Sequence, residues 1–139
     1  MNALHVDAVE LRRVRIPLLS PFRTSYGVDH FRDAIVLRVC TREGVEGWGE
    51  CVADVEPLYS PEYADGAQHV LRHHLVPRVL GAGAVSGADV APLLGRVQGH
   101  PMAKAALEMA VLDAELRAAG TSFAQRLGAV RTQIGRAHV

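Results

Sequence analysis

The chain has 139 residues, of which 49% are hydrophobic and 22% are charged, so it can bury the core of one domain and is too apolar for a disordered chain. Its 15 basic and 15 acidic residues cancel, which argues against nucleic acid or an anionic membrane as a partner. No apolar run reaches the length of a membrane span, and the first residues lack the apolar core of a signal peptide, so we expect a cytoplasmic protein.

The amino-terminal part of the chain predicts three strands. The apolar residues of the first strand, 4–16, change face at Arg12-Arg13, which predicts a bulge or a bend there. Residues 17–32 are mostly polar, with two prolines and a glycine, and predict a long loop. The segments 33–41 and 45–52 follow as strands, with Ile35, Leu37 and Val39 sharing one face of the former. Two strands joined by a short turn favour an antiparallel meander.

The later part of the chain predicts helices. Helix starts are indicated at Ser60-Pro61, at Ser86 and at His100-Pro101, since serine caps a helix and proline fits its first turn. Pro77 is expected to kink or end the first helix, and Gly120 to end the third. Ser122 and Gln125 then form a capping box for one more short helix. The order predicts an α+β fold, a three-stranded antiparallel meander followed by a helical bundle.

Two cysteines lie in the predicted hairpin of the second and third strands. The expected register sets Cys40 opposite Gly47 and Cys51 opposite Val36. The two sulfur atoms would then be about 13 Å apart along the sheet, because each strand residue advances roughly 3.3 Å. A disulfide needs a far shorter distance, so we expect two free thiols.

Several segments, taken together, resemble one protein family. In order and spacing they match the N-succinylamino acid racemase / o-succinylbenzoate synthase branch of the enolase superfamily. The helix AALEMAVLD is similar to a signature shared with mandelate racemases and muconate lactonizing enzymes, whereas PFRTSYG and PLYSPEY point to the branch. The matching segments are VELRRVRIPLLSPFRTSYG, EGWGEC, PLYSPEYADGAQHVLRHHLVP and PMAKAALEMAVLDAELRAAGTSFAQRLG.

The resemblance implies an amino-terminal capping domain that closes the mouth of a (β/α)-barrel. Two loops, here residues 21–26 and 52–59, would cover the distal part of the substrate. The barrel abstracts a proton next to a carboxylate, and a lid excludes water and selects the substrate. By this similarity the candidate substrate-binding residues are Phe22, Arg23, Thr24, Ser25, Tyr26 and Tyr59.

These residue types suit an acyl group with an anionic end. Phe22 and Tyr26 would supply apolar walls, although they could equally anchor the loop to the core. Arg23 would bind a carboxylate such as that of a succinyl group, or would pair with Asp29. Tyr59 would add a ring face and a hydroxyl.

Other polar residues are expected to have no catalytic role. The neighbouring pair His73-His74 diverges on an ideal helix, which disfavours a metal site. The carboxylates near the second loop are interpreted as solvated loop charges, namely Glu50, Asp54 and Glu56.

The catalytic groups that the resemblance implies are two lysines and three carboxylates that bind Mg²⁺ or Mn²⁺, all on the barrel. Lys104 is the only lysine of the chain and belongs to the signature helix. We therefore expect no catalytic residue and no metal site in this segment, and no activity of this segment alone. The resemblance also implies a homo-oligomeric enzyme acting on an N-acyl amino acid or on a succinylbenzoate-type substrate of menaquinone biosynthesis.

The chain is expected to divide at its carboxyl end. Residues 1–128 would form the capping domain and residues 129–133 the start of the connection to a barrel. Residues 134–139 (IGRAHV) are the translation of ATC GGA AGA GCA CAC GTC, which is the start of a common sequencing adapter. We therefore interpret them as read-through into the adapter.

Three alternatives stay open at this stage. The chain could be the cap of another superfamily member, such as a dipeptide epimerase or a muconate-type lactonizing enzyme. It could be a stand-alone module that binds small acyl ligands with the loop at Phe22–Tyr26. It could also be an interaction protein that uses the surface a barrel would otherwise cover.

Overall fold

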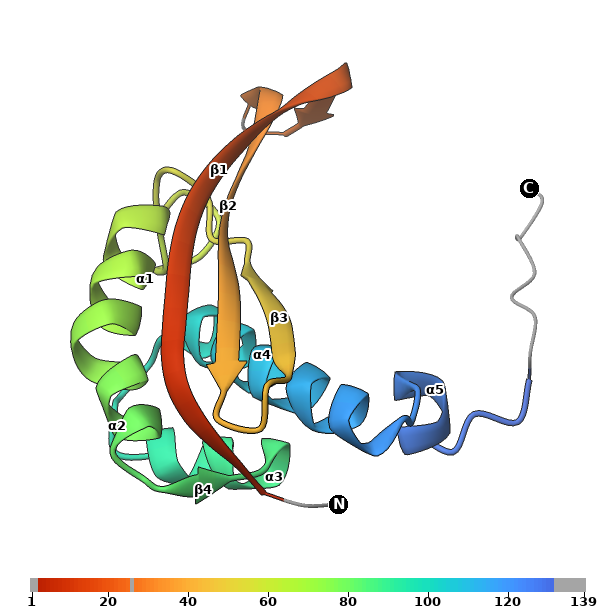
Figure 1. The fold of residues 1–139 in the computed structure, drawn as a ribbon. Helices are drawn as coiled ribbons and strands as arrows, with labels where there is room; N and C mark the ends of the chain where they lie inside the picture. The colour runs from red at the N-terminus through yellow and green to blue at the C-terminus, as the bar shows by residue number, and fades with distance from the viewer. Residues whose placement is uncertain (1–2, 26, 132–139) are drawn as a thin grey trace.

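A four-stranded antiparallel sheet forms the centre of the fold, with strand order β3-β2-β1-β4 and helices packed on one face (Figure 1). The computed structural model describes residues 3–25 and 27–131. The strands are β1 (Leu4–Thr24), β2 (Gly27–Thr41), β3 (Glu46–Cys51) and β4 (Ala84–Val85).

The helices follow the first three strands. Three helical segments run without interruption, of which the middle one is a π-helix: α1 (Ala64–Val70), η1 (Leu71–Leu75) and α2 (Val76–Leu80). After β4 come α3 (Gly87–Leu94), α4 (Pro101–Ala119) and α5 (Phe123–Arg126).

The α+β fold is confirmed, and the sheet has one strand more than predicted. β4 pairs with the start of β1 through Leu4–Val85 and His5–Ala84. A two-residue strand contains no alternation to detect, so the sequence pattern could not indicate it. The predicted starts at Ser86 and His100-Pro101, the stop at Gly120 and the Ser122–Gln125 capping box are confirmed.

The region predicted as a long loop, residues 17–32, is instead the far end of a β-hairpin. β1 and β2 pair as far as Thr24 and Gly27, with one irregularity between Pro17 and Phe22. Of the bulge or bend predicted at Arg12-Arg13, the bulge is wrong, because both residues pair regularly with β2. The apolar residues change face there because the strand leaves the core, as the exposed Ile16 shows.

One face of the sheet carries the core. Ile35, Leu37 and Val39 on β2 are fully buried, as predicted, against apolar side chains of α1, η1, α2, α3 and α4. The alternation stops where β2 becomes exposed, from Gly27 to Arg32. The hairpin therefore projects beyond the helices, which the red and orange strands of Figure 1 show. We call residues 15–24 and 27–33 the hairpin arm.

Both cysteines are free thiols, as predicted. The register differs by one residue from the expected one, since Cys40 lies opposite Glu46 and Cys51 opposite Ile35. Cys51 is buried on the core face, and this burial raises the pKa of its thiol.

The first helix starts at Ala64, three residues after the predicted Pro61. The Ser60 hydroxyl accepts a hydrogen bond from the Glu62 amide and closes a turn instead. The Glu62 carboxylate is engaged elsewhere, because it accepts hydrogen bonds from the amides of Met102 (2.8 Å) and Ala103 (3.2 Å) at the start of α4. The helix also continues past Pro77 to Leu80, with the π-helical segment η1 just before the proline.

Surface hydrogen bonds link β1 to the turn after β2. The His5 ring nitrogen lies 2.9 Å from a Glu43 carboxylate oxygen, and the His5 amide donates to the same carboxylate. The pKa of Glu43 falls from 4.5 to about 2, chiefly through the hydrogen bond from the His5 side chain. Because the folded-state pKa is depressed, the contribution to stability is complete above pH 4.5 and is lost as the pH falls toward 2.

A carboxylate titration by NMR tests this pair. We expect Glu43 to titrate near pH 2 in the native protein and at a higher pH, closer to 4.5, after His5→Ala, because only the backbone hydrogen bonds then still lower its pKa. An unchanged titration midpoint in the variant would show that the His5 side chain does not cause the lowered pKa of Glu43.

Candidate functional site: a groove beside the hairpin arm

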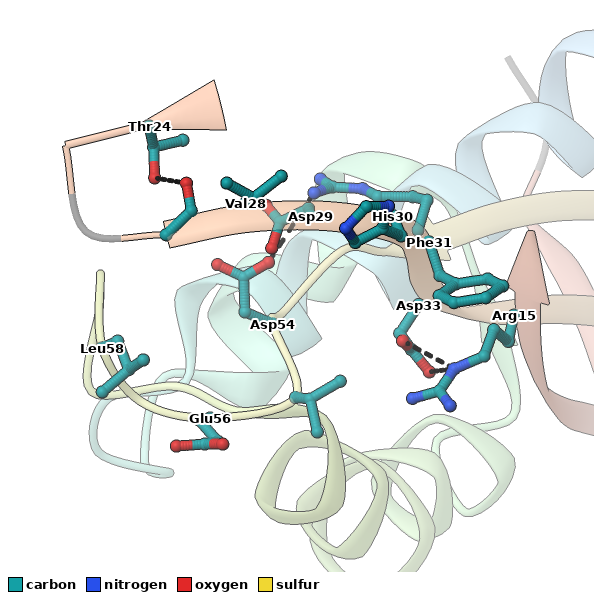
Figure 2. Close-up of a pocket in the computed structure, with 13 residues that line it drawn as sticks. Arg15, Thr24, Val28, Asp29, His30, Phe31, Asp33, Asp54, Glu56 and Leu58 are labelled. Atoms are coloured by element: carbon teal, nitrogen blue, oxygen red, sulfur yellow. Dashed lines mark hydrogen bonds and ion pairs between the residues drawn. The ribbon is translucent and has the colours of Figure 1, made fainter. Parts of the chain in front are cut away.

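An open groove of about 400 Å³ lies between the hairpin arm and the loop that follows β3 (Figure 2). β1 and β2 form one wall, and the loop residues Asp54–Leu58 form the other. The hairpin wall consists of Arg15, Thr24, Gly27, Val28, Asp29, His30, Phe31, Arg32 and Asp33, and the loop wall of Asp54, Val55, Glu56 and Leu58.

The groove exists because the arm extends past the core. The strands stay paired to their tip, where the Thr24 hydroxyl donates to the Gly27 carbonyl at 3.2 Å. Apolar side chains of the arm have no core beneath them, and they remain exposed as Ile16, Leu19, Phe22 and Phe31. Large apolar groups exposed together mark a surface for a ligand or for another part of a protein.

Two arginines of the hairpin wall are held by carboxylates. Arg15 donates through Nε to Asp33 at 3.1 Å, with its guanidinium 5.6 Å from the Phe31 ring centre. Arg32 pairs with Asp54 at 3.6 Å and so connects the two walls. The Arg15–Asp33 pair is visible in Figure 2. The Arg32–Asp54 pair is about half exposed on each side, and such a pair holds the walls together by only about 0–1 kcal/mol.

The remaining polar groups of the groove suit the binding of a ligand rather than catalysis. His30 and Glu56 lie on opposite walls, and no ion pair among residues 3–25 and 27–131 includes either of them. The groove thus offers an imidazole ring, a carboxylate and apolar surface to a small polar ligand.

The structure brings one predicted site residue, Thr24, into the groove. Phe22 lines a neighbouring hollow of about 380 Å³ together with Pro21 and Phe31. Arg23 lies on the same arm and is exposed, and no ion pair joins it to Asp29. In the register of β1 and β2, Arg23 lies opposite Val28, and Phe22 lies opposite Asp29. Asp29 and Arg23 therefore point to opposite faces.

The other predicted residues lie at the tip and on the far loop. Ser25 is exposed in the turn between β1 and β2. Tyr26 lies outside the described residues, as does the segment 134–139. Tyr59 is 72% exposed, one residue beyond the groove-lining Leu58.

Several groove residues were missed from the sequence, chiefly Arg15, His30, Phe31 and Arg32. No local signal marked them, because residues 28–33 (VDHFRD) do not alternate between apolar and polar types, and the two prolines of the preceding segment indicated a loop. Asp54 and Glu56 are exposed, as predicted, and both line the groove.

Neither a cluster of three or more metal ligands nor a membrane helix is found in the described part of the chain. Within residues 3–25 and 27–131, no three His, Cys, Asp or Glu side chains converge in a way that could hold a metal ion. Across the same residues, every helix is too short or too polar to span a bilayer.

Comparison with known proteins agrees with this architecture. Residues 7–128 match the family described as mandelate racemase / muconate lactonizing enzyme, N-terminal domain. The chain is 56% identical over 131 residues to an N-succinylamino acid racemase of Amycolatopsis sp and 35% identical over 132 residues to an o-succinylbenzoate synthase of Geobacillus stearothermophilus. These alignments cover 94% and 95% of this chain.

Solved structures show the same fold. A member of the enolase superfamily from Listeria innocua superposes with a TM-score of 0.85 at 30% identity, over 94% of this chain and 35% of that chain. The chain likewise spans 35% of the length of the two curated relatives. The match over residues 7–128 shows that the chain belongs to the N-terminal capping domain family of the enolase superfamily's mandelate racemase and muconate lactonizing enzymes.

Proposed function

We propose that this chain is the substrate-selecting cap of a racemase or synthase that abstracts a proton next to a carboxylate. One observation carries the proposal: a capping domain 56% identical to that of an N-succinylamino acid racemase has an exposed groove between its hairpin arm and the Asp54–Leu58 loop. A lid of this kind raises the rate by excluding water and fixing the distal part of the substrate.

The substrate proposed is an N-succinyl amino acid. The relative at 56% identity favours the racemase over the o-succinylbenzoate synthase, whose representative is 35% identical. The exposed apolar residues of the arm suit the methylene chain of a succinyl group, and a guanidinium suits its carboxylate. The residues proposed to bind it are Phe22, Arg23, Thr24, Ser25, Tyr26 and Tyr59.

The divalent metal of the family is proposed to bind outside this chain. Within the described residues no cluster of carboxylates or histidines fits Mg²⁺, so no step of the reaction is assigned to a metal on this domain. When bound to the barrel, such an ion stabilises the charge that develops on the substrate carboxylate.

The isolated chain is expected to be inactive. Purified protein with Mg²⁺ and N-succinyl amino acids in deuterated water should show no exchange of the α-proton above the background rate. Since the only lysine, Lys104, donates to the Val97 carbonyl beside α4, it is committed to the fold. Exchange by the chain alone would overturn the assignment of the catalytic groups to a barrel.

Arginine substitutions in a chimeric enzyme test the site. In the chimera, residues 1–128 replace the matching segment of the Amycolatopsis racemase. Arg23→Ala is expected to lower kcat/KM about 10–100-fold, mainly through KM, because a hydrogen bond between charged groups contributes about 1.5–3 kcal/mol.

The matched control is Arg12→Ala. Arg12 is an exposed arginine of the same strand that pairs with Glu10, away from the arm. Its loss should leave kcat/KM within about twofold, as for ordinary surface substitutions. Equal effects of the two substitutions would contradict a substrate contact of Arg23.

A further inference from the structure

Three histidine rings gather on the exposed side of the first helix, away from the groove. His69 belongs to α1, and His73 and His74 belong to the π-helical segment η1. The ring centres of His69 and His73 are 4.6 Å apart, and those of His69 and His74 are 5.9 Å apart. All three side chains are exposed, so solvent and ions reach them.

The π-helical turn explains why the rings meet. On an ideal α-helix only the residue at position i+4, His73, would lie beside His69, and His74 would diverge. A π-helical turn is wider and brings the residue at i+5 toward the same side. The cause lies in Pro77, which has no amide hydrogen and whose ring would clash with the carbonyl of His73 in a regular α-helix.

The spacing of His69 and His73 fits two ligands of one ion. A metal–nitrogen distance of about 2.0–2.1 Å puts each ring centre roughly 3.2 Å from the metal, so two rings at a tetrahedral angle have centres about 5 Å apart. The observed separation of 4.6 Å is close to this value. We propose that His69 and His73 form a surface site for a divalent transition-metal ion such as Zn²⁺ or Ni²⁺, with water as the remaining ligands.

The neighbouring groups limit the site to two protein ligands. Asp65 lies one turn before His69, but its carboxylate is engaged by Arg13. Within the described residues no third His, Cys, Asp or Glu converges with the pair. Imidazole nitrogen selects Zn²⁺, Ni²⁺ and Cu²⁺ over Mg²⁺, which prefers oxygen ligands.

Isothermal titration calorimetry of the 139-residue chain without a polyhistidine tag tests the site. We expect saturable binding of one Zn²⁺ and no binding of Mg²⁺. His69→Ala and His73→Ala should each weaken Zn²⁺ binding by at least about tenfold, because even the loss of a group that orients a metal ligand costs about 10–100-fold. The double variant gives the background due to other groups such as the thiol of Cys40.

His74→Ala is the matched control, since it removes an exposed histidine of the same turn. It should leave the affinity for Zn²⁺ unchanged. Amide NMR spectra with Ni²⁺ give a second readout: signals from residues 65–77 should broaden in the native chain and in His74→Ala, but not in the double variant. The proposal is overturned if His69→Ala and His73→Ala bind Zn²⁺ as tightly as the native chain, or if His74→Ala weakens binding as much as His73→Ala does.

Discussion

Replacing Gly49 by alanine is expected to destabilise the fold by at least about 3 kcal/mol, a large part of the roughly 5–15 kcal/mol that stabilises a typical domain. β3 lies directly against α4, and a Cβ atom at Gly49 would be 2.1 Å from the Ala106 carbonyl oxygen. At Gly47 the corresponding atom would be 2.0 Å from the Ala110 carbonyl oxygen. Both contacts are with backbone atoms of α4, so the steric clash can be relieved only if the whole helix moves away from β3.

Urea denaturation measures this effect, and Gly27→Ala is the control. Gly27 is also a strand glycine, but a Cβ atom there would have no atom within 4 Å, so a change of no more than about 0.5 kcal/mol is expected. If Gly49→Ala unfolds at the same urea concentration as Gly27→Ala, the close approach of α4 to β3 is wrong.

Replacing Glu62 by alanine is the second change with a large expected effect, about 2–4 kcal/mol of lost stability. The Glu62 side chain is 6% exposed, and its two oxygens accept hydrogen bonds from the first free amides of α4. Its loss leaves buried donors without partners and removes a negative charge from the positive end of the helix dipole. Glu62→Gln keeps one carbonyl acceptor and should lose roughly half as much.

The matched control for this substitution is Glu56→Ala, which removes an exposed carboxylate from the same connection. Its free energy of unfolding should stay within about 0.5 kcal/mol of the native value. Equal stability of the Glu62→Ala and Glu56→Ala variants would show that the buried carboxylate is not a helix cap.

The sequence predicts those parts of the fold that local patterns determine. The alternation at Ile35, Leu37 and Val39 marks the core strand, and the start and end signals of α4 lie within the helix itself. The contacts that the sequence could not reveal join distant segments. Glu62 caps a helix that begins about 40 residues later, so its loop could not be distinguished from a helix start by local signals.

The resemblance predicted the two segments that form the candidate site, but the sequence did not predict which residues line its walls. The hairpin arm buries little apolar surface, so burial produces no alternation of apolar and polar residues along it. Residues such as His30 and Arg32 therefore lacked a local signal, and their role depends on the Asp54–Leu58 loop lying opposite.

The rate of racemisation by the chimeric enzyme tests most directly whether this chain is a racemase cap. Residues 1–128 on the Amycolatopsis barrel should racemise N-succinyl amino acids with kcat/KM within about tenfold of the parent, which corresponds to roughly 1.4 kcal/mol in the transition state. The barrel alone should be much slower. A chimera that has the circular dichroism and oligomeric state of the parent, but is no faster than the barrel alone, would contradict the proposed function.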